Sequence, residues 1–371
     1  MINQERLLQE FMELVQIDSE TKFEREICDV LKIKLTELGL DVFEDDTTSI
    51  TGHGAGNLIA TLPGTVQGPT IYFTCHMDTV TPGKGIKPSV KDGYVVSDGT
   101  TILGSDDKAG IAAILEGLRT LKEQGIAHAA IQLLITVGEE SGLVGAKAFD
   151  RSLLQADYGF ALDSNGKVGD IIVAAPTQAK IKAVVHGKAA HAGVNPEDGI
   201  SAIQVASRAI MRMPLGRIDE ETTANIGRIE GGQATNIVCP RVDLLAEARS
   251  VVPEKMEAQV EKMKKAFAEA AEEFQTQIDV DVHVMYPGFK FGEGDLVTQK
   301  AIAAVKKVGR HPRLLASGGG SDANVVAGFG IPTVNLAIGY EEIHTTNEKM
   351  PIEELNKAAE LVVALVQTAL E

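Results

Sequence analysis

The sequence is poor in cysteine, and it has no long apolar run. Its 371 residues include 3 cysteines, Cys28, Cys75 and Cys239, which lie far apart and form no CxxC pair. This odd, scattered count provides no thiolate metal site and fits a reduced compartment, so we expect a cytoplasmic protein. No apolar run approaches the roughly 18 residues that span a bilayer. The charged, amphipathic start MINQERLLQEFMELV does not resemble a signal peptide, and we expect no membrane partner.

The shortage of positive charge excludes a second class of partner. Lys and Arg number 35 against 52 Asp and Glu, which gives a formal net charge of −17. Nucleic-acid binding needs a concentrated positive surface, so we expect no nucleic-acid partner. An acidic substrate must instead be bound by a local cation, because the overall negative charge of the protein repels it.

The sequence also lacks GxxxxGK[ST], which excludes a P-loop, and GHGAG (52–56) predicts a turn.

Two thirds of the chain have the pattern of an α/β domain. Continuous apolar strands alternate with helical segments, which is typical of a sheet covered by helices on both faces. We therefore predict a mixed sheet with helices on both faces. The predicted strands are 57–62, 70–74, 131–137, 158–162, 313–316 and 332–338, and the predicted helices are 3–16, 23–38, 107–122, 295–308, one starting near 321, and 352–370.

The segment between these parts has a different pattern. QAKIKAVVHG (178–187) and IDVDVHVMY (278–286) alternate polar and apolar residues, as half-exposed antiparallel strands do. With strands near 222–230 and 236–248 and helices at 197–212 and 254–275, they predict a four-stranded antiparallel sheet with two helices. We therefore predict a discontinuous catalytic domain, 1–177 and 288–371, with an inserted α+β lid or dimerisation domain, 178–287.

Polar side chains follow the apolar strands at several points. Singly, each is explained by a turn, a helix cap, a solvated loop or a surface histidine. Functional groups gather outside the carboxyl ends of strands in open α/β sheets, so together they predict one site. The groups are His76 and Asp78 after TIYFT, Asp106 and Asp107 in LGSDDKAG, Glu139 and Glu140 after IQLLITV, Asp163 after YGFAL, and His344 in YEEIHTTNE.

These residue types indicate a metal site with hydrolytic chemistry. Two imidazoles and several carboxylates without a thiolate suit zinc, and such a site also accepts cobalt or manganese. Two ions roughly 3.5–4 Å apart can share one carboxylate and activate a water. Of Glu139 and Glu140, one can bind metal while its neighbour stays free as general base. Asp78 can receive the second N–H of His76.

The glycine-rich SGGGSDAN (317–324) predicts either an anion-binding nest or a tight turn.

The segments HMDTV, LGSDDKAG, TVGEESG, LDSN and HTTNE, in this order, resemble the dinuclear-zinc exopeptidase family. That family includes peptidase T, aminoacylase, glutamate carboxypeptidase and succinyl-diaminopimelate desuccinylase. The resemblance covers essentially the whole chain, including GKAAHAGVNPEDGISAI and GGQATNIVC in the predicted insertion. It is nearest to the peptidase T-like branch, through TILGSDDKAG.

The resemblance implies a role for each matching residue. It implies two zinc ions per subunit, with Asp106 as the bridging ligand, followed by Asp107 through a cis peptide bond. Glu139 is implied as general base and Asp78 as the residue that orients His76. The implied ligands are His76, Asp106 and Asp163 for one ion and Asp106, Glu140 and His344 for the other. In the insertion, His191 is implied to hydrogen-bond the scissile carbonyl oxygen, and Asn236 and Arg249 to bind substrate.

We therefore predict a metallo-exopeptidase in which a hydroxide bridging two zinc ions attacks a short peptide, most simply a tripeptide aminopeptidase. An N-acyl-amino-acid amidohydrolase or a carboxypeptidase with the same site stays open, since this chain has His191-Ala-Gly where peptidase T has His-Pro-Gly. An inactive peptide-binding homologue is a more distant alternative. The sequence also leaves open whether the inserted domain forms a homodimer, and whether His191 acts within its own subunit or in a partner.

Overall fold

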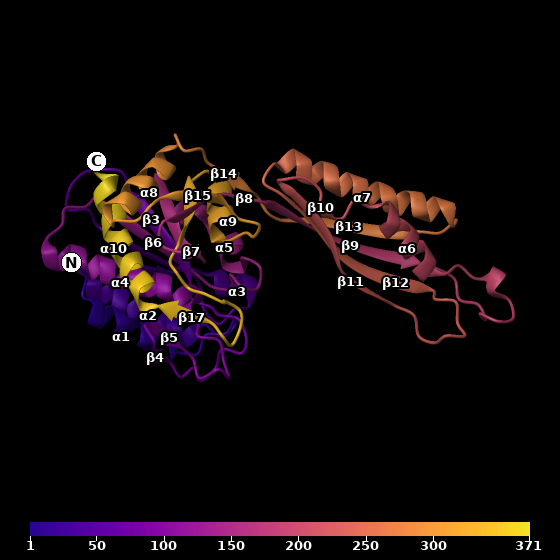
Figure 1. Cartoon of the computed structure of the whole chain (residues 1–371), viewed down its shortest axis with the longest axis horizontal. Helices are drawn as coiled ribbons and strands as arrows, with labels where there is room; N and C mark the ends of the chain where they lie inside the picture. The colour runs from indigo at the N-terminus through magenta and orange to yellow at the C-terminus, as the bar shows by residue number, and fades with distance from the viewer. The chain divides into compact units, whose positions relative to one another are not determined.

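The computed structural model describes residues 1–371, which form two compact units (Figure 1). The first contains Met1–Ala174, Phe291–Ala316 and Ser321–Glu371, and the second contains Ala175–Lys290 and Ser317–Gly320. The chain leaves the first unit after Ala174 and re-enters it at Phe291, whose N–H donates to the carbonyl of Val173 at 2.8 Å. None of the helices combines the length and the apolar character that crossing a membrane would require.

The first unit is built on a mixed sheet with the strand order β1-β2-β6-β3-β7-β16-β8, and β15 also pairs with β8. Strands β6, β3, β7 and β16 are parallel, whereas β1, β2 and β8 run antiparallel to their neighbours on this path. Its strands are β1 (Asp41–Glu44), β2 (Leu58–Leu62), β3 (Ile71–His76), β6 (Ile131–Thr136), β7 (Tyr158–Ser164), β8 (Asp170–Ala175), β15 (Arg313–Ala316) and β16 (Thr333–Ala337).

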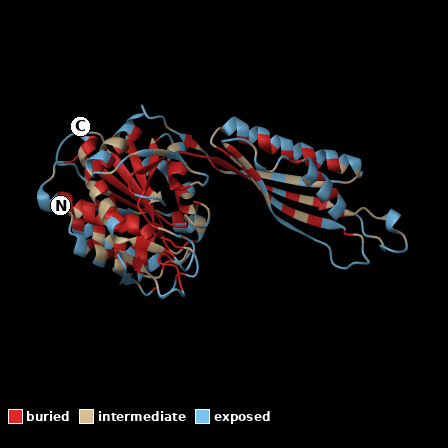
Figure 2. Ribbon diagram, viewed as in Figure 1, coloured by how far each residue is buried: buried red, intermediate tan, exposed pale blue.

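Helices cover both faces of this sheet, as the sequence predicts. Along β3, Phe73 and Cys75 pack into the large core that includes buried residues of α1, α2, α4 and α10, whereas Tyr72 belongs to a cluster on the opposite face with Val326 of α9. The central strands β3, β6, β7 and β16 are accordingly mostly buried, whereas β1 and β15 are exposed or half-buried (Figure 2). The helices are α1 (Gln4–Val15), α2 (Arg25–Leu38), α3 (Thr47–Thr51), α4 (Ser105–Gln124), α5 (Val144–Ala148), the 3-10 turn η1 (Arg151–Leu153), α8 (Leu296–Lys307), α9 (Asp322–Gly328) and α10 (Ile352–Ala369).

Helix α4 lies unusually close to the sheet at Gly110. A Cβ atom there would lie 2.5 Å from the carbonyl oxygen of Leu162 and 2.8 Å from the sulfur of Cys75, so a side chain would not fit. The glycine therefore allows the first turn of α4 to approach the ends of β3 and β7. This approach brings Asp106 and Asp107 to the same edge of the sheet as His76.

The second unit has one antiparallel sheet in the order β10-β11-β12-β9-β13, with α6 and α7 on one face. The predicted alternation holds in β9, where Ala179, Ile181, Ala183 and Val185 are buried against the helices. The four long strands match the predicted four, and the two-residue β10 is an addition. The elements are β9 (Thr177–His186), η2 (Pro196–Asp198), α6 (Ala202–Arg212), β10 (Gly216–Arg217), β11 (Thr222–Gly231), β12 (Arg241–Ser250), α7 (Pro253–Glu273), β13 (Ile278–Tyr286) and β14 (Phe289–Lys290).

Several boundaries differ from those predicted, for local reasons. Strand β12 begins at Arg241 and not near 236; Pro240, just before it, has no N–H to donate to a neighbouring strand. Helix α6 begins at Ala202, where the side chain of Ser201 caps it by accepting the N–H of Gln204. The sequence does not predict β1, β8 or a small sheet made of β4 (Ser89–Lys91), β5 (Tyr94–Val96) and β17 (Lys349–Pro351).

Candidate active site

His76 ends β3 at the carboxyl edge of the main sheet, and its ring is buried. Its Nδ1 lies 2.9 Å from the backbone carbonyl oxygen of Asp78, whereas Oδ1 of Asp78 is 3.6 Å away. An N–H on Nδ1 therefore donates to the carbonyl, and Nε2 keeps its lone pair for a metal ion. Nε2 points toward Oδ1 of Asp106 at 3.0 Å and Oδ1 of Asp163 at 3.7 Å.

His344 approaches Asp106 and Glu140 from the loop before β17. Its Nε2 lies 2.9 Å from Oε1 of Glu140 and 3.3 Å from Oδ2 of Asp106. Asp106 thus lies between two imidazoles, with a different oxygen facing each of them. This is the arrangement that a carboxylate shared by two metal ions needs.

Two groups of side chains bring their ligand atoms within 4.8 Å of one another. One group is His76, Asp106 and Glu140, and the other is His76, Asp107 and Asp163. Asp107 is not among the ligands that the sequence suggests. The peptide bond between Asp106 and Asp107 is cis, and neither carboxylate oxygen of the buried Asp107 accepts a hydrogen bond.

Burial and mutual interactions shift the pKa values of the acids at this edge of the sheet. Burial raises the pKa of Glu139 well above its usual range, and the charge of Asp163 adds to the effect. Burial likewise raises the pKa of Asp163 to about 6, although its hydrogen bond with His76 opposes the shift. Burial would also raise the pKa of Asp106, but hydrogen bonds with His344 and His76 outweigh it and lower that pKa.

This donor set fits divalent metal ions. Several carboxylates are held together away from water, and a cation would relieve both their repulsion and the unpaired oxygens of Asp107. The imidazoles of His76 and His344 add the nitrogen ligands that zinc, cobalt and manganese accept. The nearby thiol of Cys75 contributes no thiolate, because burial raises its pKa well above the usual value.

The turn that carries Glu139 and Glu140 follows β6 and is held from two sides. The Asp78 carboxylate accepts the N–H of Glu139 on Oδ1 at 2.9 Å and the N–H of Glu140 on Oδ2 at 3.3 Å. On the other side, Nε2 of His53 lies 3.1 Å from the hydroxyl of Ser141. The GHGAG segment, predicted only as a turn, therefore supports the glutamate turn.

Asp163 is held by two residues that the sequence does not single out, Asn335 and Tyr340. The side-chain amide of Asn335, on the neighbouring β16, accepts the N–H of Asp163 at 3.0 Å and donates to its carbonyl at 2.7 Å. The hydroxyl of Tyr340 donates to Oδ1 of Asp163 at 3.1 Å. Asn335 lies in the predicted strand 332–338, and its polarity inside an apolar run is the signal that could have identified it.

Asp322 is a further buried acid near the site. It belongs to SGGGSDAN, accepts a hydrogen bond from the hydroxyl of Thr136 at the end of β6, and lies at the start of α9. Burial raises its pKa to about 7, and the charges of Asp163 and Asp78 add to the shift. The sequence singles out this segment only for its glycines.

In the second unit, His191 and Asn236 lie on adjacent segments. His191 is exposed, and the N–H of Ala192 donates to the carbonyl of Asn236 at 2.9 Å. Arg249 lies near the far end of β12. At ~3.3 Å per residue it is about 25 Å along that strand from its first residue, Arg241. The structure thus brings His191 and Asn236 together and separates both from Arg249.

The guanidinium of Arg249 already has partners. Its Nε and Nη2 donate to the carboxylate of Glu247 at 2.9 and 3.1 Å, and its Nη1 donates to the carbonyl of Gly318 at 3.1 Å. Arg249 therefore connects β12 to the glycine-rich 317–320 segment. Its side chain is one-quarter exposed, so it can still meet a ligand.

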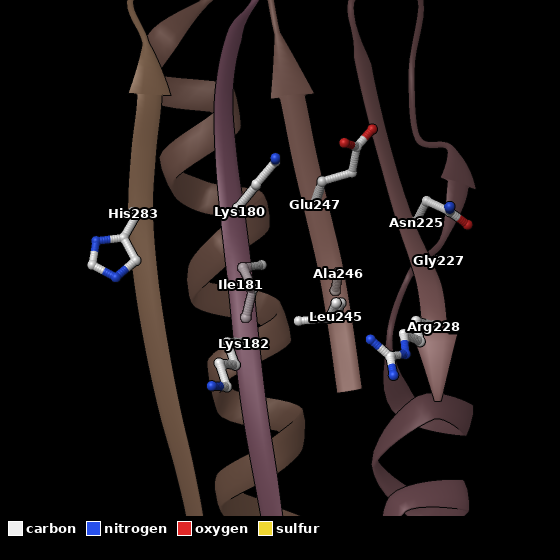
Figure 3. Close-up of a pocket in the computed structure, with 10 residues that line it drawn as sticks. All are labelled: Lys180, Ile181, Lys182, Asn225, Gly227, Arg228, Leu245, Ala246, Glu247 and His283. Atoms are coloured by element: carbon white, nitrogen blue, oxygen red, sulfur yellow. The ribbon is translucent and has the colours of Figure 1, made fainter. Parts of the chain in front are cut away.

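A separate hollow of about 470 Å³ lies on the second unit's sheet, on the face away from the helices (Figure 3). Lys180 and Lys182 of β9 and Arg228 of β11 lie around it, together with Glu247. None of the candidate metal ligands lines this hollow, so the interpretation of function rests on the strand-end groups of the first unit.

Comparisons with known proteins show which family this chain belongs to. The profile of Peptidase family M20/M25/M40 matches residues 72–368. The solved structure of aminopeptidase PepT from Bacillus cereus ATCC 10987 is 67% identical, with a TM-score of 0.97 and 100% of both chains covered. A tripeptidase structure from Staphylococcus aureus subsp. aureus Mu50 is 51% identical, with a TM-score of 0.98 and 100% of both chains covered. The Bacillus subtilis (strain 168) protein YqjE is 68% identical over 369 residues, again 100% of both chains.

Proposed function

Because this chain belongs to peptidase family M20/M25/M40, a family of peptide-bond hydrolases, we propose that it is a tripeptide aminopeptidase with two metal ions. The observation that carries the proposal is the position of Asp106, whose two oxygens face His76 at 3.0 Å and His344 at 3.3 Å. The names of the Bacillus cereus and Staphylococcus aureus relatives support the substrate class.

The ligands proposed for the metal ions are those implied by the family resemblance. His76, Asp106 and Asp163 would hold one ion, and Asp106, Glu140 and His344 the other. Zinc is the proposed metal, with cobalt and manganese as alternatives that carboxylate-rich sites accept. When bound, the ions would polarise the scissile carbonyl and lower the pKa of a water molecule.

Glu139 is the proposed general base. Its neighbour Glu140 lies against His344 and would bind metal, which leaves Glu139 free, and the raised pKa of Glu139 makes its carboxylate a stronger acceptor for a proton. Glu139 would take the proton of the attacking water and pass it to the amine that leaves. The carbonyl of Asp78 would fix the tautomer of His76, and the Asp78 carboxylate would fix the backbone of Glu139.

The proposal assigns substrate contacts to the second unit. His191 would donate a hydrogen bond to the carbonyl oxygen as negative charge develops on it, and Asn236 would lie beside it on the paired segment. Arg249, already paired with Glu247, would bind a substrate carboxylate and would be the local cation that an overall charge of −17 requires. A cytoplasmic location and a homodimer formed through the inserted domain remain predictions.

A substrate panel tests this function. The purified protein is incubated with free tripeptides, N-acetylated tripeptides, C-amidated tripeptides and N-acetyl amino acids, and the products are identified by mass spectrometry. We expect release of the N-terminal residue from free tripeptides, with little hydrolysis after N-acetylation, since an aminopeptidase requires the free amine. Preferential hydrolysis of N-acetyl amino acids would contradict the proposal and favour the amidohydrolase alternative.

A further inference from the structure

Glu348 is a buried acid in the loop that carries His344. It is 2% exposed, lies four residues after His344, and immediately precedes β17. Its carboxylate accepts four hydrogen bonds from the segment that precedes and begins α4. The donors are the N–H groups of Leu103 at 2.9 Å and Gly104 at 3.0 Å to Oε2, and the hydroxyl of Ser105 at 2.6 Å and the N–H of Asp106 at 3.1 Å to Oε1.

The backbone of Asp106 is therefore held by an acid that lies 242 residues away in the sequence. Gly104 has a φ of 75°, so the chain turns sharply just before Ser105, and consecutive N–H groups there point toward one acceptor. Charge-assisted hydrogen bonds of this kind are shorter and stronger than neutral ones. Glu348 thus fixes the direction from which the side chain of Asp106 enters the site.

The same residue anchors the loop of His344. The base of that loop is closed by two backbone hydrogen bonds between Glu341 and Lys349, at 2.9 and 3.1 Å. Within it, the N–H of Glu348 donates to the carbonyl of Thr345 at 3.1 Å. His344 itself has a φ of 62° and a side chain that is 48% exposed, so packing constrains it little.

We propose that Glu348 is a positioning residue that joins these two loops, so that Asp106 and His344 meet at the distance a metal ion needs. This inference rests on the proposed function, because it assumes that both residues bind metal. His76 and Asp163 depend on other supports, namely the carbonyl of Asp78 and the side chain of Asn335. Asp106 would serve both ions, but only the ion held by Glu140 and His344 would lose support for a second ligand. Loss of Glu348 should therefore weaken that ion more than the ion held by His76 and Asp163.

Metal-binding measurements on the full chain test this inference. Wild type and Glu348→Gln are dialysed against graded concentrations of free zinc, and bound metal is measured by mass spectrometry. A glutamine can offer only one oxygen to the four donors, and its NH₂ group, itself a donor, would face the remaining N–H or O–H groups. We expect one dissociation constant to rise about 10–100-fold, the range typical for lost supporting contacts around metal ligands, while the other changes less than about threefold.

The matched control is Glu341→Gln, which removes one half-buried acid from the base of the same loop. The side chain of Glu341 pairs only with Lys349 at 3.1 Å, and its backbone hydrogen bonds are kept. We expect this variant to bind metal as the wild type does. Thermal unfolding of the metal-free proteins, compared across all variants, shows whether Glu348→Gln keeps its fold.

A milder variant keeps the inference testable if Glu348→Gln does not fold. Ser105→Ala removes one of the four hydrogen bonds, and we expect the same selective weakening at about threefold to tenfold. Equal dissociation constants in wild type and the folded variant, or equal weakening of both ions, would overturn the role of Glu348. A wild-type protein that binds fewer than two ions would contradict the proposed function itself, and this inference with it.

Discussion

The carboxylate of Asp78 accepts the backbone N–H of Glu139 at 2.9 Å, while the carbonyl of Asp78 lies 2.9 Å from Nδ1 of His76. One residue thus supports both a candidate metal ligand and the candidate general base. The two strands that carry them, β3 and β6, are parallel neighbours, so both groups emerge at the same edge of the sheet. A change at Asp78 therefore affects the position of both groups at once.

Replacing Glu139 by glutamine should abolish most of the activity without removing metal. The amide keeps the shape of the side chain but cannot accept a proton from water, and general-base catalysis typically contributes about 10²–10⁴-fold. We expect kcat to fall by about that factor, with little change in metal content or thermal stability. Steady-state kinetics with a tripeptide and metal analysis of the same preparation measure both effects.

Glu13→Gln on α1 is the matched control, since Glu13 is exposed and lies far along the chain from the site residues. It should have the kcat of the wild type. A Glu139→Gln protein with near-normal kcat would show that another group takes the proton.

Asp78→Asn should reduce activity less, and through position alone. An asparagine can accept only one of the two backbone N–H groups, and its NH₂ group would face the other. We expect kcat to fall about 10–100-fold, with the KM for the tripeptide nearly unchanged. Asp29→Asn, an exposed change on α2, serves as the comparison. Wild-type kinetics in Asp78→Asn would contradict the orienting role.

Removing metal should abolish hydrolysis reversibly. Prolonged dialysis against a chelator should eliminate activity, and zinc, cobalt or manganese should restore it to different extents. The loaded protein should also unfold at a higher temperature, because an ion that binds the folded state at 100 times its Kd stabilises it by about 2.7 kcal/mol. Differential scanning calorimetry before and after chelation measures this shift. Activity that survives complete metal removal would exclude the metalloenzyme interpretation.

The ion pairs of Glu44 should make stability depend on pH away from the site. Burial alone would raise the pKa of Glu44, but hydrogen bonds from Arg25 at 2.6 Å and Lys32 at 2.9 Å outweigh it and lower the pKa to about 2. Because the folded pKa lies below the unfolded value of about 4.3, this contribution is present above pH 4.3 and is lost as the pH falls toward 2.

Glu44→Gln should therefore lower the free energy of unfolding at pH 7 by about 1 kcal/mol, a modest value because Arg25 and Lys32 are 45% and 40% exposed. The difference between wild type and variant should shrink as the pH falls from 4.3. Urea denaturation of both proteins at pH 7, 5 and 3 measures it. A difference that stays constant over this range would show that Glu44 acts through packing.

The sequence predicts the strands that are buried on both faces, because full burial requires a continuous apolar run. β3 is such a strand, with all six residues buried. β1 is an edge strand with an exposed and half-buried pattern, and only β2 pairs with it, so its four residues carry almost no apolar signal. Strands of three residues, such as β4 and β5, are too short for a period to be recognised.

The supporting residues of the site could not be predicted for a different reason. Asn335 contacts Asp163 across 172 positions, and Glu348 contacts Leu103 across 245. No local sequence pattern predicts such a contact, because the contact depends on which segments become neighbours in the fold. In the HTTNE segment the sequence indicates His344 as the functional residue, yet it is Glu348 that accepts the buried hydrogen bonds from the start of α4. The roles of His191, Asn236 and Arg249 stay predictions.

The hydrogen bond between Phe291 and Val173 has a consequence for engineering. The chain departs from the first unit and returns to it at points only one strand spacing apart, so the ends of the insertion define a natural graft junction. A segment of different length or sequence can be spliced there at a small entropic cost, since the cost of closing a loop rises only slowly with its length. Transplanting 175–290 together with 317–320 between relatives would therefore test whether the second unit sets substrate preference, with the strand-end residues left untouched.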